Sequence, residues 1–228
     1  MAERLVRIRG SEFDRGLVAV TAELLQDGAV IVHPTETIHG YGCRYDRADS
    51  IERIRRLKGR PDTRPLILLV PDQSWIDTLC RDVTLRARAL AEKFWPGALT
   101  LVFRAGLPIR NHPAWNCDTI ALRQSSHPFT ALVVREADLP VVSTSLGISG
   151  GEVPGDPAAF VEELLAAGAA DPGDLPALAV IDDLLNNAFR PSTVLSVAEP
   201  ERVVLLREGA IPAAEIERAS GIELIKRS

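Results

Sequence analysis

Short apolar runs, many of them rich in β-branched residues, recur along the chain, and longer stretches with helical spacing separate them. Runs of this length, bounded by Gly, Pro or Asp, predict β-strands. We predict strands at residues 29–33, 66–70, 99–103, 119–123, 141–143, 178–182, 193–197 and 202–207. Several of these runs are apolar at almost every position, which is typical of strands that helices cover on both faces.

Between the strands, apolar residues three or four positions apart indicate amphipathic helices. We predict helices at residues 14–26, 48–58, 84–95, 128–136 and 157–167. Alternation of this kind favours an α/β fold. The stretch 168–176 is rich in Ala, Asp, Gly and Pro and reads as a surface loop, so we predict one domain over residues 1–228, with a core at about 14–209 and a short C-terminal tail at 213–228.

Composition narrows the class of protein. The chain is 46% hydrophobic and 25% charged, with a formal net charge of -5, which argues against a protein that coats nucleic acid non-specifically. Its three cysteines form no CxxC pair, and neither they nor the four histidines show the spacing of zinc ligands. The first ten residues carry charges and no apolar segment, and no apolar run reaches membrane-spanning length. We therefore expect a cytoplasmic protein with no membrane contact.

The segment HPTETIHGYG, residues 33–42, follows a predicted strand and crowds hydroxyls and a carboxylate into a turn before two glycines. Glycines allow a ligand to approach the backbone closely, and Thr35 or Thr37 could donate a hydrogen bond to a bound carboxylate. The residues alone leave an alternative open, in which Thr35 caps a short helix and Glu36 lies in its first turn.

The segment KGRPDTRP, residues 58–65, ends a run of six cations with one anion that starts at Arg53. Cations at the end of a helix complement its dipole, so a solvated helix end is one interpretation. Two prolines also stiffen the loop, and a stiff loop can hold guanidinium groups toward a triphosphate. The chain contains no GxxxxGK[ST] phosphate-binding loop.

A third segment, VSTSLGISGG at residues 142–151, runs from a strand into a loop of hydroxyls and glycines. Such loops present backbone N–H groups and hydroxyls to phosphates or carboxylates. Taken alone, it is equally compatible with a plain Gly/Ser turn.

Six segments occur in a characteristic order: HPTETIHGYGC, KGRPDTRPLILLV, WPGALTLVF, IALRQSSHP, STSLGISG and RPSTVL. Together they resemble the motif series of the YrdC family and cover roughly residues 28–209. The most distinctive feature is the pairing of PTET with KGRP about twenty residues later.

This resemblance implies an α/β fold with an open, twisted mixed sheet and flanking helices around a concave basic cavity. It also implies a nucleotidyltransferase that joins L-threonine, bicarbonate and ATP into threonylcarbamoyl-AMP and releases pyrophosphate. The product would feed the threonylcarbamoyladenosine modification of tRNA through a downstream tRNA threonylcarbamoyl transferase complex. Mg²⁺ would accompany ATP, held mainly by phosphate and water rather than by a protein site. Contact with tRNA or another double-stranded RNA stays open.

The resemblance also assigns residues by motif position. Threonine would be held by Thr35, Arg123, Ser145 and Ser192. ATP would be surrounded by Lys58, Arg60, Arg64, Thr119, Gly147 and Arg207, with Lys58 and Arg60 catalytic. Arg123 suits the threonine carboxylate as a bidentate partner, although an arginine that ends a strand can also form a structural ion pair. The motifs contain no arrangement typical of a protein nucleophile, which suits catalysis by positioning and charge neutralisation.

Four departures from the family pattern stand out. Gly147 occupies the place of an asparagine and Leu146 that of an alanine, Ser125 stands where a proline is usual, and Asp182-Asp183 begins a stretch where a glycine pair is usual. We expect a Gly147→Asn exchange to restore a side-chain amide beside the nucleotide and to tighten ATP binding.

Two alternatives accompany the synthase hypothesis. The sequence STSL without the asparagine also resembles the YciO-like branch, so the chain could bind or act on a related acyl adenylate. A non-catalytic RNA-binding module could use the same basic surface. The acidic net charge and an aromatic content of only 5% weigh against that last alternative.

Overall fold

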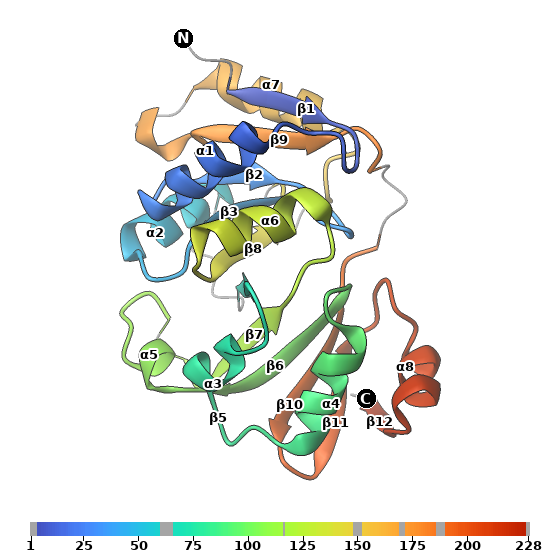
Figure 1. Ribbon diagram of the computed structural model, residues 1–228. Helices are drawn as coiled ribbons and strands as arrows, with labels where there is room; N and C mark the ends of the chain where they lie inside the picture. The colour runs from blue at the N-terminus through green and yellow to red at the C-terminus, as the bar shows by residue number, and fades with distance from the viewer. Residues whose placement is uncertain are drawn as a thin grey trace.

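The computed structural model describes residues 4–59, 66–115, 117–147, 152–168, 172–185 and 190–226. Within these residues, a 12-stranded mixed sheet runs through the whole chain in the order β1-β9-β2-β3-β8-β4-β7-β6-β10-β11-β12, and β5 pairs with β6. Figure 1 shows that the strand direction turns strongly between β1 and β11, so the sheet is open and twisted. The predicted fold class is confirmed.

The described elements have the following bounds. The strands are β1 Leu5–Ile8, β2 Ile31–His33, β3 Gly40–Arg44, β4 Ile67–Leu69, β5 Cys80–Arg81, β6 Leu99–Ala105, β7 Thr119–Arg123, β8 Val141–Ser145, β9 Leu178–Asp182, β10 Thr193–Glu199, β11 Arg202–Arg207 and β12 Leu224–Lys226. The helices are α1 Arg15–Gln26, α2 Ala48–Leu57, α3 Trp75–Leu79, α4 Leu85–Phe94, α5 Leu107–Arg110, α6 Pro128–Ala137, α7 Pro157–Ala167 and α8 Ala213–Ser220, with a 3₁₀ turn at Pro172–Asp174.

All eight predicted strands and all five predicted helices are present, and the bounds of β7, β9, β11 and α7 agree with the prediction. The sequence missed β3 because two of its five residues are glycine, which disfavours strands. The structure explains these glycines. A Cβ on Gly40 would lie 2.6 Å from the Thr144 carbonyl oxygen, and one on Gly42 would lie 2.9 Å from the His33 ring. Close packing of β3 against its neighbours therefore needs both glycines.

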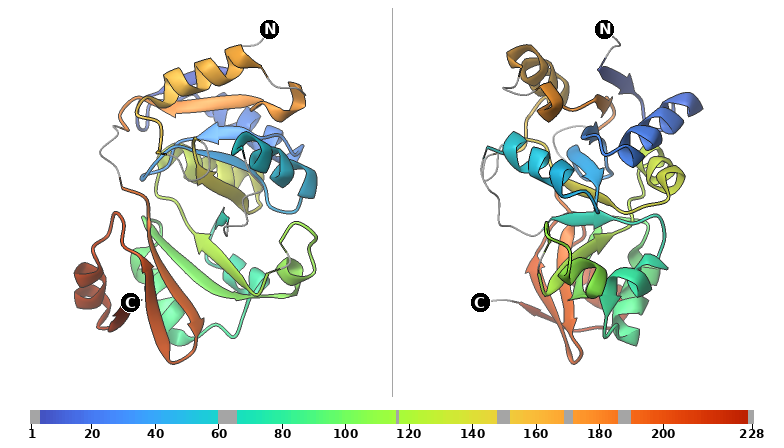
Figure 2. Two further views of the ribbon diagram at one scale, coloured as in Figure 1. Left: turned by 180° about the vertical axis from the view of Figure 1, so that it is seen from behind. Right: turned by 90° about the vertical axis from the view of Figure 1, so that its left-hand side faces the viewer.

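Helices cover both faces of the sheet (Figures 1 and 2). Helices α1 and α6 lie side by side on one face and enclose a small apolar cluster with Ile31 and Val180. Helices α2 and α7, with α3, α4 and α8, enclose the larger cluster on the other face, which includes the neighbouring residues Val32 and Ile181. Adjacent residues of β2 and β9 thus point into different cores, which accounts for their continuous apolar runs.

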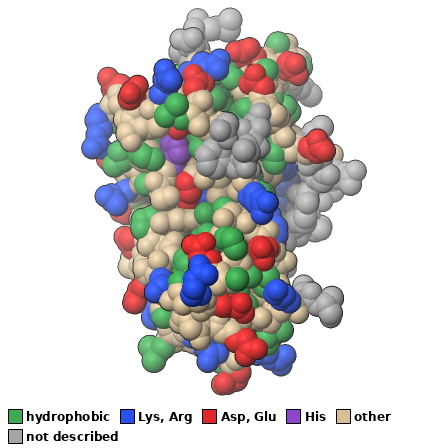
Figure 3. Space-filling model, turned by 90° about the vertical axis from the view of Figure 1, so that its right-hand side faces the viewer, with side chains coloured by type: hydrophobic (Ala, Val, Ile, Leu, Met, Phe, Trp, Pro, Cys, Tyr) green, Lys and Arg blue, Asp and Glu red, His purple; other side chains and the backbone are tan. Residues whose placement is uncertain are grey.

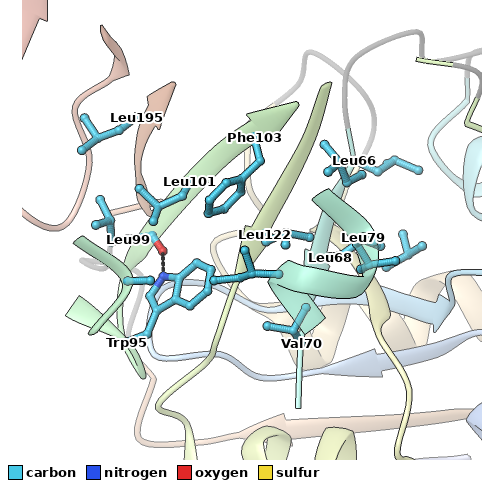
Figure 4. Packing of buried hydrophobic residues seen from close by; sticks show 14 of the residues in the cluster. Leu66, Leu68, Val70, Leu79, Trp95, Leu99, Leu101, Phe103, Leu122 and Leu195 are labelled. Atoms are coloured by element: carbon cyan, nitrogen blue, oxygen red, sulfur yellow. Dashed lines mark hydrogen bonds between the residues drawn. The ribbon is translucent and has the colours of Figure 1, made fainter. Parts of the chain in front are cut away.

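The larger cluster is centred on β6, β7 and the helices that pack on them (Figure 4). Trp95 lies beside Leu99, Leu101 and Leu122 there, and its indole N–H donates to the Leu99 carbonyl oxygen at 2.6 Å. A buried indole needs such a partner for its N–H. The indole is therefore buried with its N–H satisfied, next to the strands that carry the site.

The C-terminal stretch 213–226 packs on the domain as α8 and β12. Ile216 and Leu224 are buried in the larger cluster, and β12 pairs in parallel with β11 at the end of the sheet. The stretch that we predicted as a tail is therefore part of the fold as far as residue 226. Among the described helices, none is long and apolar enough to cross a membrane.

Candidate active site

The PTET segment forms a self-contained turn between β2 and β3. The Thr35 hydroxyl accepts hydrogen bonds from the backbone N–H groups of Thr37 and Ile38 and donates to the Ile38 carbonyl oxygen at 2.7 Å. The Thr37 hydroxyl lies 2.8 Å from that of Thr35. The alternative in which Thr35 caps a helix is wrong, because residues 34–39 contain no helix and the hydroxyl closes a turn instead.

Arg123 ends β7 and reaches this turn although it is almost fully buried. Its Nη1 donates to the Thr37 hydroxyl at 2.9 Å and its Nε to the Gly97 carbonyl oxygen at 3.1 Å. Its Nη2 lies 2.7 Å from Oε1 of Glu36. The structural ion pair that the sequence left open is thus present, and it holds the guanidinium beside the proposed threonine pocket.

Glu36 is fixed from a second side by Ser125, whose hydroxyl donates to Oε2 at 2.6 Å. Burial alone would raise the pKa of Glu36, but the charge of Arg123 and the hydrogen bond from Ser125 outweigh it and lower the pKa below its usual value. The carboxylate is therefore ionised at neutral pH. Sequence reasoning placed Glu36 only in a capping alternative, and the departure from proline at Ser125 was the signal that could have found this contact.

Lys58, predicted to bind ATP, and Ser145, predicted to bind threonine, meet in the structure. Lys58 follows the last residue of α2, and its buried side chain donates from Nζ to the Ser145 carbonyl oxygen at 2.7 Å. Ser145 in turn pairs with Gly40, next to the PTET turn. Two further residues of the basic loop, Arg60 and Arg64, lie outside the described residues, so their ATP-binding roles stay predictions.

Ser192 and Arg207 form a second group from the C-terminal half. The Ser192 hydroxyl lies 2.8 Å from that of Thr100, and Arg207 donates from Nη2 to the Ser192 carbonyl oxygen at 2.9 Å. Partial burial, and then the positive charge of Arg123, lower the pKa of Arg207. The backbone connects the two arginines: Arg123 bonds the Gly97 carbonyl group, and Thr193, next to Ser192, bonds that of Ala98, so both cations lie in one region.

Thr119 lies at the start of β7, at the other end of the strand from Arg123. Ile67 of β4 pairs with Ala121 of β7 on one side and with Ser143 of β8 on the other. The start of β7, at Thr119, therefore lies at the same end of the strands as the end of β8, at Ser145. Its hydroxyl makes no hydrogen bond to another predicted site residue in the described part of the chain. Its role in ATP binding stays a prediction.

Gly147 departs from the family for a reason that the structure reveals. Its φ of +96° lies in a region that side chains rarely adopt, and a Cβ would lie 3.0 Å from Cδ of Pro154. Asparagine at this position would therefore strain the loop and push against Pro154. The effect of Gly147→Asn on ATP binding stays a prediction, and the structure adds the conformational cost that the exchange must meet.

A buried histidine cluster beneath the PTET turn was missed from the sequence. Nε2 of His127 lies 2.9 Å from Oδ2 of Asp182, and Nε2 of His39 accepts from the Asp182 backbone N–H. Oδ1 of Asp182 accepts two further backbone N–H bonds, from Gly10 and Leu184. Burial lowers the pKa of His39 to about 4, so its ring is neutral and able to accept at neutral pH. The aspartate in place of a usual glycine was the signal for this cluster.

The arginines of α2 are engaged at the surface. Arg53 pairs with Asp49 and Arg55 with Glu52, while Arg56 pairs with Asp174. The face in Figure 3, on the other side of the molecule from α2, also mixes positive and negative side chains. Much of the cation run is therefore a solvated helix surface, as the simpler interpretation proposed, whereas Lys58 turns inward.

The comparisons with known proteins agree with the motif series. The Sua5/YciO/YrdC family model, described as "Telomere recombination", matches residues 23–209. A threonylcarbamoyl-AMP synthase of Bacillus subtilis (strain 168) is 33% identical over 206 residues, which is 90% of this chain and 56% of that protein. The chain thus spans little more than half the length of this relative.

Solved structures share the fold. Sua5 of Pyrococcus abyssi complexed with L-threonine has a TM-score of 0.82 at 27% identity, over 96% of this chain and 62% of that one. YciO of E. coli has a TM-score of 0.78 at 24% identity, over 95% of this chain and 99% of that one. The second likeness supports the fold alone.

Proposed function

Because the chain belongs to the Sua5/YciO/YrdC family, we propose that it is an L-threonylcarbamoyladenylate synthase. One observation carries the proposal: three cations from distant motifs each bond a residue of the proposed pocket or of the turn beside it. Arg123 bonds Thr37, Arg207 bonds Ser192, and Lys58 bonds the backbone of Ser145. Such a region suits the carboxylate of an amino acid together with a nucleotide triphosphate.

In the proposed reaction, the α-ammonium group of threonine first loses a proton to solvent. The free amino nitrogen then attacks the carbon of bicarbonate, and water is lost. An oxygen of the resulting carbamate then attacks the α-phosphorus of ATP, and pyrophosphate leaves. Thr35, Arg123, Ser145 and Ser192 would orient threonine. The ATP-binding set would be Lys58, Arg60, Arg64, Thr119, Gly147 and Arg207, and its cations would neutralise the charge that develops on the phosphates.

Mg²⁺ fits this proposal as a companion of ATP. Glu36 is already bound by Arg123 and Ser125, and Asp182 by His127 and two backbone N–H groups. Among the described residues, no group of three or more His, Cys, Asp or Glu could hold a metal ion. The ion would be held by phosphate oxygens and water, and its chemistry would be to polarise the phosphate.

The product would pass to a tRNA threonylcarbamoyl transferase complex, and we propose that this takes place in the cytoplasm. Direct contact of this chain with tRNA is a weaker part of the proposal. Arg53, Arg55 and Arg56 pair with carboxylates, which leaves less positive charge on α2 for a phosphate backbone.

Selectivity for the side-chain hydroxyl tests this function. With ATP, Mg²⁺ and bicarbonate, we expect pyrophosphate release to depend on L-threonine. Serine should be accepted about 10–100-fold less well, because it lacks one methyl group, and valine should be rejected more strongly, because a buried hydroxyl partner stays unpaired. Omission of bicarbonate is the control and should abolish release. Equal release with valine and threonine would contradict the assignment.

A YciO-like activity on a related acyl adenylate is the second candidate. One observation favours it: Gly147 replaces the usual asparagine. If pyrophosphate release is absent with every amino acid while a preformed acyl adenylate binds, this candidate replaces the synthase.

A further inference from the structure

The electropositive region poses a problem for an amino acid substrate. Arg123 and Arg207 attract a carboxylate, but the α-ammonium group of the same molecule would be repelled by them. The carboxylate and ammonium groups of an α-amino acid are separated by a single carbon atom. A site that binds both needs an acceptor for the ammonium group beside its arginine, and an anion is the strongest acceptor.

Glu36 supplies an anion at that place. Its Oε1 lies 2.7 Å from Nη2 of Arg123, and 18% of its side chain is exposed, against 5% for Arg123. Oε1 is buried against the arginine, while part of the Glu36 side chain is exposed. Each carboxylate oxygen can accept more than one hydrogen bond, so Glu36 keeps acceptor capacity after its contacts with Arg123 and Ser125.

The orientation of this pair is fixed by neighbours. Thr37 and the Gly97 carbonyl group hold the guanidinium, and Ser125 holds the carboxylate. Arg123 donates hydrogen bonds to described residues from two of its five N–H groups, and its buried Nη2 faces Glu36 as an ion pair without a well-formed hydrogen bond, which leaves donor capacity for a ligand. A preformed pair of this kind costs little ordering when a ligand binds.

We propose that Glu36 is the specificity residue that receives the α-ammonium group of the substrate, while Arg123 receives its carboxylate. The pair forms a zwitterionic clamp that selects α-amino acids over hydroxy acids. Ser125 is a positioning residue, which keeps the Glu36 carboxylate turned toward the ligand. This inference rests on the proposed function, since it names how that same site recognises its amino acid.

The test compares two ligands in two proteins. L-Threonine and (R)-3-hydroxybutyrate, which lacks the amino group, are titrated by ligand-detected NMR against the wild type and Glu36→Gln. In the wild type, threonine should bind about 10–100-fold more tightly than the analogue, as expected for one charged hydrogen bond. In Glu36→Gln, the affinity for threonine should fall by about that factor, so that threonine no longer binds more tightly than the analogue. An analogue too weak to measure counts as discrimination, and Glu36→Gln must then bring threonine to the same limit.

Other outcomes overturn the proposal. Equal weakening of both ligands would mean that Glu36 only positions Arg123, and tighter threonine binding in Glu36→Gln would mean that Glu36 occupies the carboxylate site itself. Unchanged discrimination would remove Glu36 from recognition altogether. Glu162→Gln, an exposed exchange on α7, is the matched control and should bind threonine as the wild type does. If the wild type binds no threonine, the proposed function fails first and the clamp with it.

Discussion

Replacement of Arg123 by methionine is expected to lower the free energy of unfolding by about 3 kcal/mol and to abolish threonine binding. The exchange leaves Glu36 charged, largely buried and without its ion-pair partner, and such a loss is far more costly than removal of an exposed pair. It also removes the hydrogen-bond donor of the Thr37 hydroxyl and of the Gly97 carbonyl group. Urea denaturation measures the first effect and calorimetric titration with L-threonine the second.

A double-mutant cycle separates the ion pair from simple packing. In the variant Arg123→Met/Glu36→Gln, the uncompensated charge is gone, and we expect about 1–3 kcal/mol of the lost stability to return. Arg88→Met is the matched control, because Arg88 pairs with Asp77 at the surface and should contribute less than about 1 kcal/mol. Strictly additive effects of the two single exchanges would show that Arg123 and Glu36 are not coupled.

Among the described glycines, Gly209 is the one at which the addition of a single methyl group, in Gly209→Ala, is expected to destabilise the fold most. A Cβ there would lie 2.1 Å from the Pro191 carbonyl oxygen and 2.6 Å from the carbonyl group of Ser192, and backbone atoms cannot move aside cheaply. We expect a loss of about 3 kcal/mol, at the upper end for an overpacked site. Because Ser192 must shift, the KM for threonine should rise as well.

Gly168→Ala is the control for this exchange. Gly168 has a positive φ of +70°, but among the described residues, its chain neighbours aside, no atom lies within 4 Å of its Cβ position, so the variant measures backbone strain without a clash. We expect a loss of about 1 kcal/mol and an unchanged KM. Equal stability of the two variants would contradict the close approach of the 209 and 191–192 backbones.

Two of the strands whose bounds the sequence predicted correctly are buried on both faces along nearly their whole length. β7 and β9 are apolar on both faces, and their bounds follow from the run of apolar residues. β3 could not be predicted, because Gly40 and Gly42 have a low propensity for strands. They are required there because Thr144 and His33 leave no space for a Cβ, which only the tertiary structure shows. β12 is three residues long, and its pairing with β11 is a tertiary contact.

The site divides in the same way. Motif order pointed to Arg123, Ser145 and Ser192, and the structure places each beside a second motif. The contact of Glu36 with Ser125 joins residues 89 positions apart, and that of His127 with Asp182 joins residues 55 positions apart. No local pattern marks such pairs. In the sequence, each pair was indicated only by a departure from the family pattern, at Ser125 and at Asp182. Such a departure does not show which distant residue the side chain contacts.

Direct detection of the product tests the central claim most sharply. The purified protein is incubated with L-threonine, ATP, Mg²⁺ and ¹³C-labelled bicarbonate. The nucleotide products are then separated by chromatography and identified by mass spectrometry. If the chain is a threonylcarbamoyl-AMP synthase, the adenylate should contain threonine and one labelled carbon, and pyrophosphate should form in equal amount. An adenylate of threonine without the labelled carbon, or AMP and pyrophosphate formed equally well without threonine, would contradict the claim.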